Sequence, residues 1–197
     1  MESSFPDHLA SRLPEVRAKH RALGLTDAES WVTLRDILRA HEVRGEEPFS
    51  DVSWIEVVWS GRLAELGRLQ FESRADGMLA VHIPESGPLA PAACDASFAR
   101  AQAVFPDHRV ASCHSWLLDP ALAEVLPHNS NIVRFQQRFE LRDHGDEAND
   151  DVLRFVFHTA DPDLDKLTPR TTLGRALVER MRGGGTWRAP TGVTSLR

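Results

Sequence analysis

The sequence predicts an α/β (α+β) fold with a mixed, mostly antiparallel central sheet and one parallel βαβ crossover. The crossover is predicted by an apolar segment at 78–83, a tight glycine-containing turn at 85–89, an amphipathic stretch at 92–105 and a second apolar segment at 109–118. Strand, turn, helix and strand in this order form the βαβ unit. With the flanking segments, the predicted order of helices and strands is ααββαβαββα.

Length and composition indicate an ordinary globular protein. The chain has 197 residues, a formal net charge of −6 and 42% hydrophobic residues. No basic block interleaves with aromatics and no apolar run approaches the ~20 residues that span a bilayer, so we expect neither a nucleic-acid nor a membrane partner. Cys94 and Cys113 show no metal spacing, and no export signal precedes them. We therefore expect reduced thiols and a cytoplasmic protein.

The first part of the chain predicts helices. We expect a short helix near 15–22 within an extension over residues 1–25, followed by a single domain over 26–197. Thr26 and Glu29 form a capping box that opens a helix at 27–42. Its predicted apolar face comprises Trp31, Leu34, Ile37, Leu38 and His41.

Helical spacing continues after a loop at 45–48. Apolar residues recur from Ile55 to Leu66, with Asp51 or Ser53 as the predicted cap. Gly67 stands where a glycine would end that helix.

From residue 69 the hydrophobic pattern changes to a period of two residues. Alternation over 69–74 predicts a strand, and Asp76-Gly77 predicts a hairpin into the strand at 78–83. The helix at 92–105 ends before Pro106.

After the strand at 109–118, Asp119 and Pro120 start a short helix over 121–126. Further strands are predicted at 133–141 and 152–158, joined by a long loop at 143–151, and Thr168-Pro169 opens a last helix that ends at Gly183. Trp187 either closes over a pocket or packs on the sheet.

Four segments resemble bacterial acyltransferase-domain-containing proteins with a GNAT-like (N-acetyltransferase-like) C-terminal domain. They are Gly67-Arg68-Leu69-Gln70-Phe71, Val81-His82-Ile83-Pro84-Glu85-Ser86-Gly87-Pro88-Leu89, Cys113-His114-Ser115-Trp116-Leu117-Leu118-Asp119-Pro120 and Ser130-Asn131-Ile132-Val133-Arg134-Phe135. The similarity covers roughly residues 24–187. It implies acyl-CoA held by a splayed pair of parallel strands, with the pyrophosphate on the loop before the central helix.

The loop departs from the pattern that this resemblance implies. The usual Gln/Arg-x-x-Gly-x-Gly/Ala loop is missing, and Pro88 has no N–H to donate. We also expect the sheet to be one leading strand short of that pattern. The predicted cofactor-binding groups are therefore main-chain groups of the strand end and turn: Ile83, Ser86, Gly87 and Leu89.

Ionisable side chains gather at the ends of the two predicted strands. His82 and Glu85 flank Pro84, and His114 follows Cys113 on the second strand. Each is a candidate general acid or base for an attacking amine. Histidine titrates near neutral pH, and partial burial can raise the pKa of a glutamate toward that range. The structural alternative is that His82 pairs with a backbone carbonyl and Glu85 caps the turn.

Other polar groups are candidates for contacting the substrate. Strand alternation places Cys113 and Ser115 on one face and His114 with Trp116 on the other, so Cys113 and His114 cannot form a dyad. Asn131 and Arg134 are placed to orient a substrate carboxylate. No metal is expected, because histidines and cysteines show no ligand spacing.

Two functions remain open from the sequence. The first is a GNAT-like N-acyltransferase that uses acyl-CoA as co-substrate and a small-molecule amine as acceptor. The second is a binding or assembly module of the same shape without CoA-dependent activity, in which the predicted strand at 133–141 pairs two copies as a homodimer.

Overall fold

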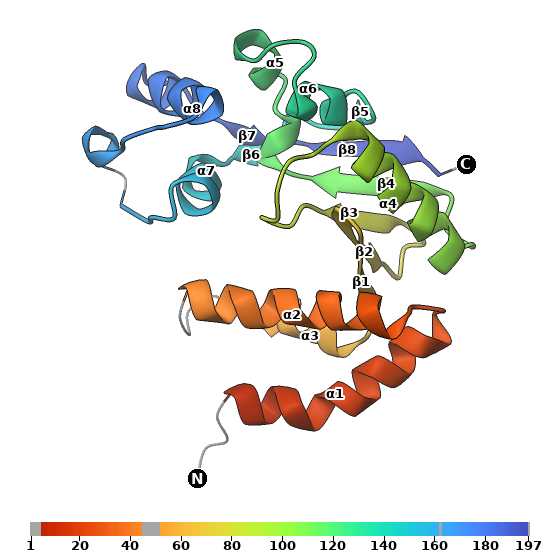
Figure 1. Cartoon of the computed structure of the whole chain (residues 1–197). Helices are drawn as coiled ribbons and strands as arrows, with labels where there is room; N and C mark the ends of the chain where they lie inside the picture. The colour runs from red at the N-terminus through yellow and green to blue at the C-terminus, as the bar shows by residue number, and fades with distance from the viewer. Residues whose placement is uncertain (1–4, 45–51, 162, 197) are drawn as a thin grey trace. The chain divides into compact units, whose positions relative to one another are not determined.

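The computed structural model describes residues 5–44, 52–161 and 163–196, and Figure 1 labels its elements. The chain divides into two compact units: Met1–Pro84, Ala92–Val110 and Leu196–Arg197 form the first, and Glu85–Pro91 and Ala111–Ser195 form the second. The predicted class is confirmed, since helices and strands are mixed and the sheet is mostly antiparallel with a parallel pair. No helix among the described residues is long and apolar enough to cross a membrane.

The first unit contains three antiparallel strands with helices against them. The helices are α1 (Phe5–Ala22), α2 (Asp27–Arg44), α3 (Val52–Trp59) and α4 (Pro91–Val104), and the strands are β1 (Leu63–Leu66), β2 (Leu69–Ser73) and β3 (Leu79–His82). Helix α2 packs against β1, and α1 packs against α2 and α3. On the other face of β2, the Phe71 ring meets Phe98 of α4 edge to face at 5.4 Å.

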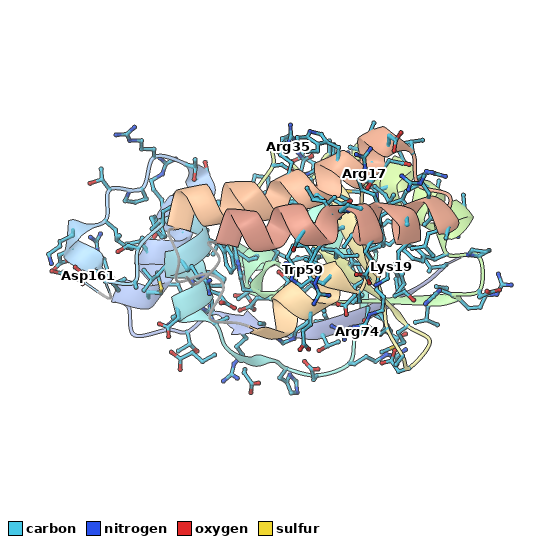
Figure 2. The ribbon with its side chains drawn as sticks, turned by 90° about the horizontal axis from the view of Figure 1, so that it is seen from below. Arg17, Lys19, Arg35, Trp59, Arg74 and Asp161 are labelled. Atoms are coloured by element: carbon cyan, nitrogen blue, oxygen red, sulfur yellow. The ribbon has the colours of Figure 1, made fainter. Side chains whose placement is uncertain are left out.

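The predicted helix through Leu66 is wrong in its second half. Helix α3 ends at Trp59, and residues 63–66 form β1, the leading strand that seemed to be missing. Gly61 ends the helix with φ of +71°, where the Lys19 side chain crosses close by and donates to the Trp59 carbonyl (Figure 2). Gly67, expected as a helix stop, instead takes the positive φ of a two-residue β1–β2 hairpin loop. The loop predicted at 45–48 and the cap at Asp51 lie outside the described residues.

The hydrogen bonds of two side chains determine which face of α2 points toward the core. Ser30 and Thr33 are buried and bond inward, to His20 Nδ1 (2.9 Å) and to the Glu65 N–H (2.7 Å). Leu34 is buried beside them, but Trp31 is exposed, so its predicted place on the inner face is wrong. The side chains of 37, 38 and 41 lie outside the described ones. The N-terminal helix is also longer than the predicted 15–22.

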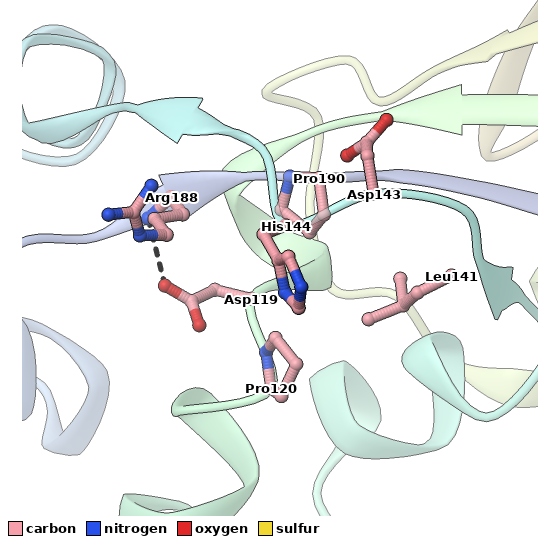
Figure 3. A pocket seen from close by; sticks show the side chains of 7 residues that line it. All are labelled: Asp119, Pro120, Leu141, Asp143, His144, Arg188 and Pro190. Atoms are coloured by element: carbon pink, nitrogen blue, oxygen red, sulfur yellow. Dashed lines mark hydrogen bonds between the residues drawn. The ribbon is translucent and has the colours of Figure 1, made fainter.

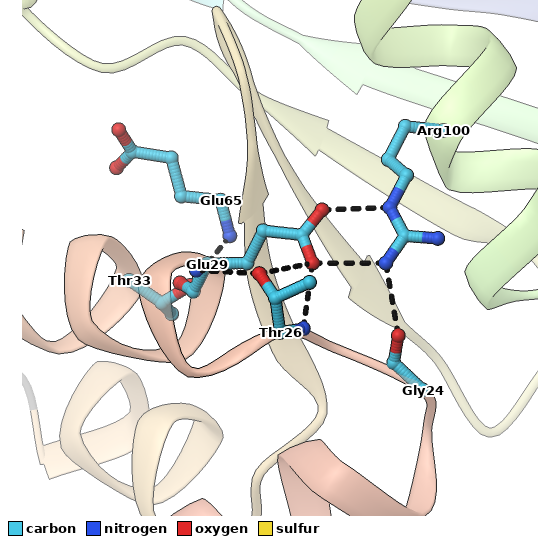
Figure 4. A network of polar contacts seen from close by, with 6 residues as sticks. All are labelled: Gly24, Thr26, Glu29, Thr33, Glu65 and Arg100. Carbon is cyan, nitrogen blue, oxygen red and sulfur yellow. Dashed lines mark hydrogen bonds and ion pairs between the residues drawn. The ribbon is translucent and has the colours of Figure 1, made fainter.

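A partly buried ion pair ties α2 to α4 (Figure 4). Glu29 receives two hydrogen bonds from the Arg100 guanidinium, at 2.6 and 2.8 Å, and Arg100 also donates to the Gly24 carbonyl. The predicted capping box is confirmed: Thr26 N–H donates to Glu29, and Glu29 N–H donates to the Thr26 hydroxyl. One carboxylate therefore serves both the start of α2 and the contact with α4.

The second unit holds the remaining strands and helices. They are β4 (Val110–His114), which enters this unit at Ala111, 3₁₀ helix η2 (Trp116–Leu118), α5 (Leu122–Val125), α6 (Asn131–Gln136), β5 (Glu140–Leu141), β6 (Asp146–Glu147), α7 (Asn149–Val156), 3₁₀ helix η3 (Leu164–Lys166), α8 (Thr172–Arg182), β7 (Arg188–Ala189) and β8 (Thr191–Ser195). The strand order is β4-β8-β5, and β6 pairs with β7.

Both strands predicted after residue 130 are wrong, because local caps favour helices. At 133–141, the Ser130 hydroxyl caps α6 by accepting from the Val133 N–H, and β5 keeps just two residues of the predicted strand. At 152–158, Val152 and Val156 lie one helical turn apart in α7, and the acidic residues of its first turn favour the helix N-terminus. The homodimer strand at 133–141 is therefore absent.

The segment after α8 forms two strands rather than a tail. Trp187 has 0% exposure, its indole N–H donates to the Leu177 carbonyl, and the Arg180 guanidinium lies over its ring at 5.0 Å. Trp187 therefore belongs to the core of the second unit and precedes β7 and β8.

Replacing Glu29 tests the tie between α2 and α4. The Arg100 hydrogen bonds hold the pKa of Glu29 at about 2, against its usual 4.5. Glu29 therefore stabilises the fold above about pH 4.5, and this contribution is lost as the pH falls toward 2. We expect Glu29→Gln to lower the free energy of unfolding by roughly 1–3 kcal/mol at pH 7 and by less at pH 3, measured by urea unfolding. Glu56→Gln, on the exposed side of α3, is the control; an equal loss in both variants would contradict the assignment.

Gly145 tests the close packing of β6 on β7. It has φ of +70°, and a Cβ there would clash with the main chain of Ala189 and Pro190. Gly184 has φ of +77° but open space around its Cβ position. We expect Gly184→Ala to cost about 1–2 kcal/mol from backbone strain, and Gly145→Ala a further 1–3 kcal/mol from displaced backbone, compared by thermal unfolding. Equal losses of stability in Gly145→Ala and Gly184→Ala would contradict the close packing of Gly145 against the β7 backbone.

Candidate functional site

Four polar side chains share one face of the β1–β2–β3 sheet. The strand register places Gln70 opposite Glu65 on one side and His82 on the other, while Glu72 lies in the next row, opposite Leu63 and Ala80. Glu65, Gln70 and Glu72 are buried, with exposures of 7%, 3% and 7%. Such buried polar groups must be hydrogen-bonded, because their transfer from water is otherwise costly.

The hydrogen bonds divide this face into two pairs. Gln70 Nε2 donates to Glu65 Oε2 at 3.1 Å, and His82 Nε2 lies 3.0 Å from Glu72 Oε2. The hydrogen bond from His82 is the main cause that lowers the pKa of Glu72, and the charges of Arg74 and Arg62 add to it. The carboxylate is therefore ionised near neutral pH and acts as an acceptor.

The His82–Glu72 pair is suited to proton transfer. An ionised carboxylate orients the imidazole and stabilises the imidazolium that forms when the ring takes a proton. His82 keeps 28% of its side chain exposed, whereas Glu72 keeps 10%, so the ring is the outer member of the pair. The structure shows His82 in contact with the Glu72 carboxylate, and the expected alternative of a backbone carbonyl partner stays a prediction.

The sequence pattern indicated His82 as a candidate site residue but did not indicate Glu72 as its partner. Gln70 and Glu72 alternate with Leu69 and Phe71, and this alternation predicts a half-buried strand with both polar residues on one face. That face is covered, because α2 packs against β1 and contributes Thr33 to the Glu65 N–H. Two glutamates and a glutamine on neighbouring strands were the available signal, but their register depends on the Gly67 hairpin.

The predicted cofactor loop bends at residues 85–87 and is mostly exposed. Ile83 is partly buried, Glu85, Ser86 and Gly87 are exposed, and Leu89 is buried. Gly87 has φ of +82° with open space around its Cβ position. Glu85 is thus exposed rather than partly buried, which removes the burial argument for its role as base. The binding roles of Ile83, Ser86, Gly87 and Leu89 stay predictions.

Strand β4 ends at His114, earlier than predicted, so Ser115 and Trp116 do not continue the alternation of the strand. Cys113 is 1% exposed and His114 is exposed, so they do lie on opposite faces. Ser115 then caps η2 by accepting from the Leu117 N–H, and Trp116 turns into the core. Trp116 therefore does not share the face of His114, which hydrogen-bonds Thr191 Oγ1 at 3.3 Å.

The remaining predicted substrate groups lie on α6. Asn131 and Arg134 are the first and fourth residues of this helix, hence on the same side, and Arg134 is exposed. Their role as carboxylate-orienting groups stays a prediction, as does substrate contact by Cys113 and Ser115.

The second unit also has an open pocket of about 530 Å³ (Figure 3). Its two aspartates bind main chain: Asp119 accepts from the Ala121 and Arg188 N–H groups, and Asp143 accepts from those of Gly145 and Thr191. These carboxylates hold loops together, and the other ionisable groups that line the pocket are His144 and Arg188. No group of three or more metal-ligating side chains occurs within residues 5–44, 52–161 and 163–196.

Residues 63–194 match the family described as the GNAT-like C-terminal domain. Among solved structures, an acyltransferase in complex with CoA and 10C-teicoplanin has a TM-score of 0.84 and 33% identity over 97% of this chain. An acyltransferase mutant with octanoyl-CoA (TM-score 0.84, 32% identity, 97% of this chain) and an acyltransferase with decanoyl-CoA and teicoplanin (0.82, 32%, 96%) are also similar. The chain spans 65% of the length of each of these proteins. No curated protein matches it in sequence.

The cysteines give a test of covalent chemistry at β4. Both thiols are buried, and burial raises the pKa of Cys113 to about 12, so its reactive thiolate is scarce at neutral pH. We expect native protein to react with a disulfide reagent at least ~100-fold more slowly than urea-unfolded protein, because the thiolate is the nucleophile. A fast-reacting equivalent in native protein would contradict the burial of these thiols.

Proposed function

The chain belongs to the family with a GNAT-like C-terminal domain, and from this premise we propose that it transfers an acyl group from acyl-CoA to the amine of a small molecule. The observation that carries the proposal is the similarity, over 97% of the chain, to acyltransferases that hold CoA or octanoyl-CoA. The His82–Glu72 pair supports it independently, because amine acylation needs a base.

The donor is held by main-chain groups at the end of β3 and in the loop that follows. The N–H groups of Ile83, Ser86, Gly87 and Leu89 are the candidate contacts for the thioester arm and pyrophosphate. Since Pro88 provides no N–H and the loop has one glycine, this cradle has fewer donors than the usual loop. The side chain of Glu85 is exposed, so it can point away from a bound anion.

His82 is the base. The neutral amine attacks the thioester carbonyl, a C–N bond forms, and the nitrogen's proton passes to His82. Main-chain N–H groups stabilise the oxyanion of the tetrahedral intermediate. The C–S bond then breaks, and the CoA thiolate takes up a proton as it leaves. His114 and Glu85 remain the other candidate bases, but both are exposed, and the contact of His114 is with the Thr191 hydroxyl.

The alternative is a binding module of the same shape that does not use CoA. The short phosphate cradle around Pro88 favours this alternative. Medium-chain donors are the sharpest probes, because the similar acyltransferases hold octanoyl-CoA and decanoyl-CoA.

Calorimetry and acyl transfer test the proposal together. We expect octanoyl-CoA and decanoyl-CoA to bind with measurable heat, and mass spectrometry to detect an acylated product from a panel of primary amines that includes amino sugars. His82→Ala should lower kcat roughly 10²–10⁴-fold, since that is the usual contribution of a general base, with donor affinity changed little.

The exposed His128 provides the matched control. His128→Ala should keep full activity. Absence of donor binding at millimolar concentration would leave the module as the better description, and full activity in His82→Ala would remove His82 from the mechanism.

A further inference from the structure

The geometry of the Glu72–His82 contact determines which ring nitrogen faces the carboxylate. Glu72 pairs with Ala80 in the β2–β3 register, and His82 pairs with Gln70, so Glu72 and His82 are diagonal neighbours on one sheet face. The contact joins Glu72 Oε2 to His82 Nε2, at 3.0 Å. The ring approaches the carboxylate through Nε2.

The surrounding charges keep Glu72 in its anionic form. Arg74 Nε lies 3.7 Å from Glu72 Oε2, and Arg62 adds a more distant positive charge. Glu65 lies on the same face, but its carboxylate receives Gln70 Nε2. An ionised carboxylate has no proton to donate, so the hydrogen between Glu72 and His82 must sit on Nε2.

We propose that Glu72 is a positioning residue that holds His82 in the Nε2–H tautomer, so that Nδ1 is the atom that takes the acceptor's proton. This inference rests on the proposed acyl transfer. As the C–N bond forms, the amine proton moves to Nδ1 and the ring becomes an imidazolium bonded to Glu72 through Nε2. As the C–S bond breaks, the CoA sulfur leaves as thiolate and accepts that proton, which restores the neutral ring.

Glu72 itself exchanges no proton in this sequence. Its contribution is to fix the tautomer and to stabilise the imidazolium, as a carboxylate does for a catalytic histidine in general. A merely structural ion pair would hold β2 to β3 but would not determine the tautomer or the pH dependence of the reaction.

The test compares Glu72→Gln with Glu65→Gln. The two glutamates have the same burial and lie on the same sheet face, but the carboxylate of Glu65 receives a hydrogen bond from Gln70. A glutamine at position 72 keeps the shape of the side chain but loses the charge, and its amide can either accept from or donate to Nε2. Thermal unfolding of both variants checks that each is folded.

Two readouts separate positioning from structure. Nitrogen-15 NMR of the histidine rings should show His82 as the Nε2–H tautomer in the wild-type chain and in Glu65→Gln, and as a mixture of tautomers in Glu72→Gln. In decanoyl transfer, Glu72→Gln should lower kcat about 10–100-fold with little change in KM for the donor. Its pH–rate profile should differ from that of Glu65→Gln, since only Glu72→Gln removes the charge that contacts the His82 ring.

The outcomes distinguish this inference from the proposed function. An unchanged tautomer and pH profile in Glu72→Gln, beside an active wild-type chain, would overturn the role of Glu72. If the wild-type chain transfers no acyl group, the proposed function fails, and the tautomer spectra still decide whether Glu72 orients the ring. A Nδ1–H tautomer in the wild-type chain would overturn the inference directly.

Discussion

The carboxylate of Glu29 is the contact on which the arrangement of the first unit depends. It closes the capping box with Thr26 and receives both hydrogen bonds from Arg100, so the start of α2 is tied to α4. One turn later, Thr33 donates to the Glu29 carbonyl and accepts from the Glu65 N–H of the edge strand β1. Helix α2 thereby covers an edge that would otherwise expose unpaired main-chain groups.

That arrangement explains why acidic side chains are buried on the sheet. Glu65, Gln70 and Glu72 face the side on which α1, α2 and α3 pack around Leu63. The same helices would be more stable over apolar residues, because buried charges cost desolvation free energy. Retaining the Glu72–His82 pair at this place is consistent with a chemical role, since natural folds break packing rules at functional sites.

The second unit uses its ionisable groups differently. Asp119 and Asp143 accept main-chain N–H groups and so hold η2, β7 and β8 in place, and Trp187 fills the core beneath α8. In the first unit the carboxylate of Glu72 meets a side chain that can change its charge, whereas in the second the carboxylates meet peptide groups that cannot. This contrast is why the chemistry is assigned to the β2–β3 face.

The sequence by itself determined the elements whose signals are local: the capping box at Thr26, the Asp76-Gly77 hairpin, the helix before Pro106 and the opposite faces of Cys113 and His114. These depend on hydrogen bonds and backbone angles within a few residues. Only the tertiary structure decided that residues 63–66 form a strand, that the alternating segment at 133–141 begins as a helix, and that Glu72 meets His82. Each of these depends on register and packing between distant segments, because an apolar residue or a glutamate is compatible with several local structures until its neighbours across the fold select one.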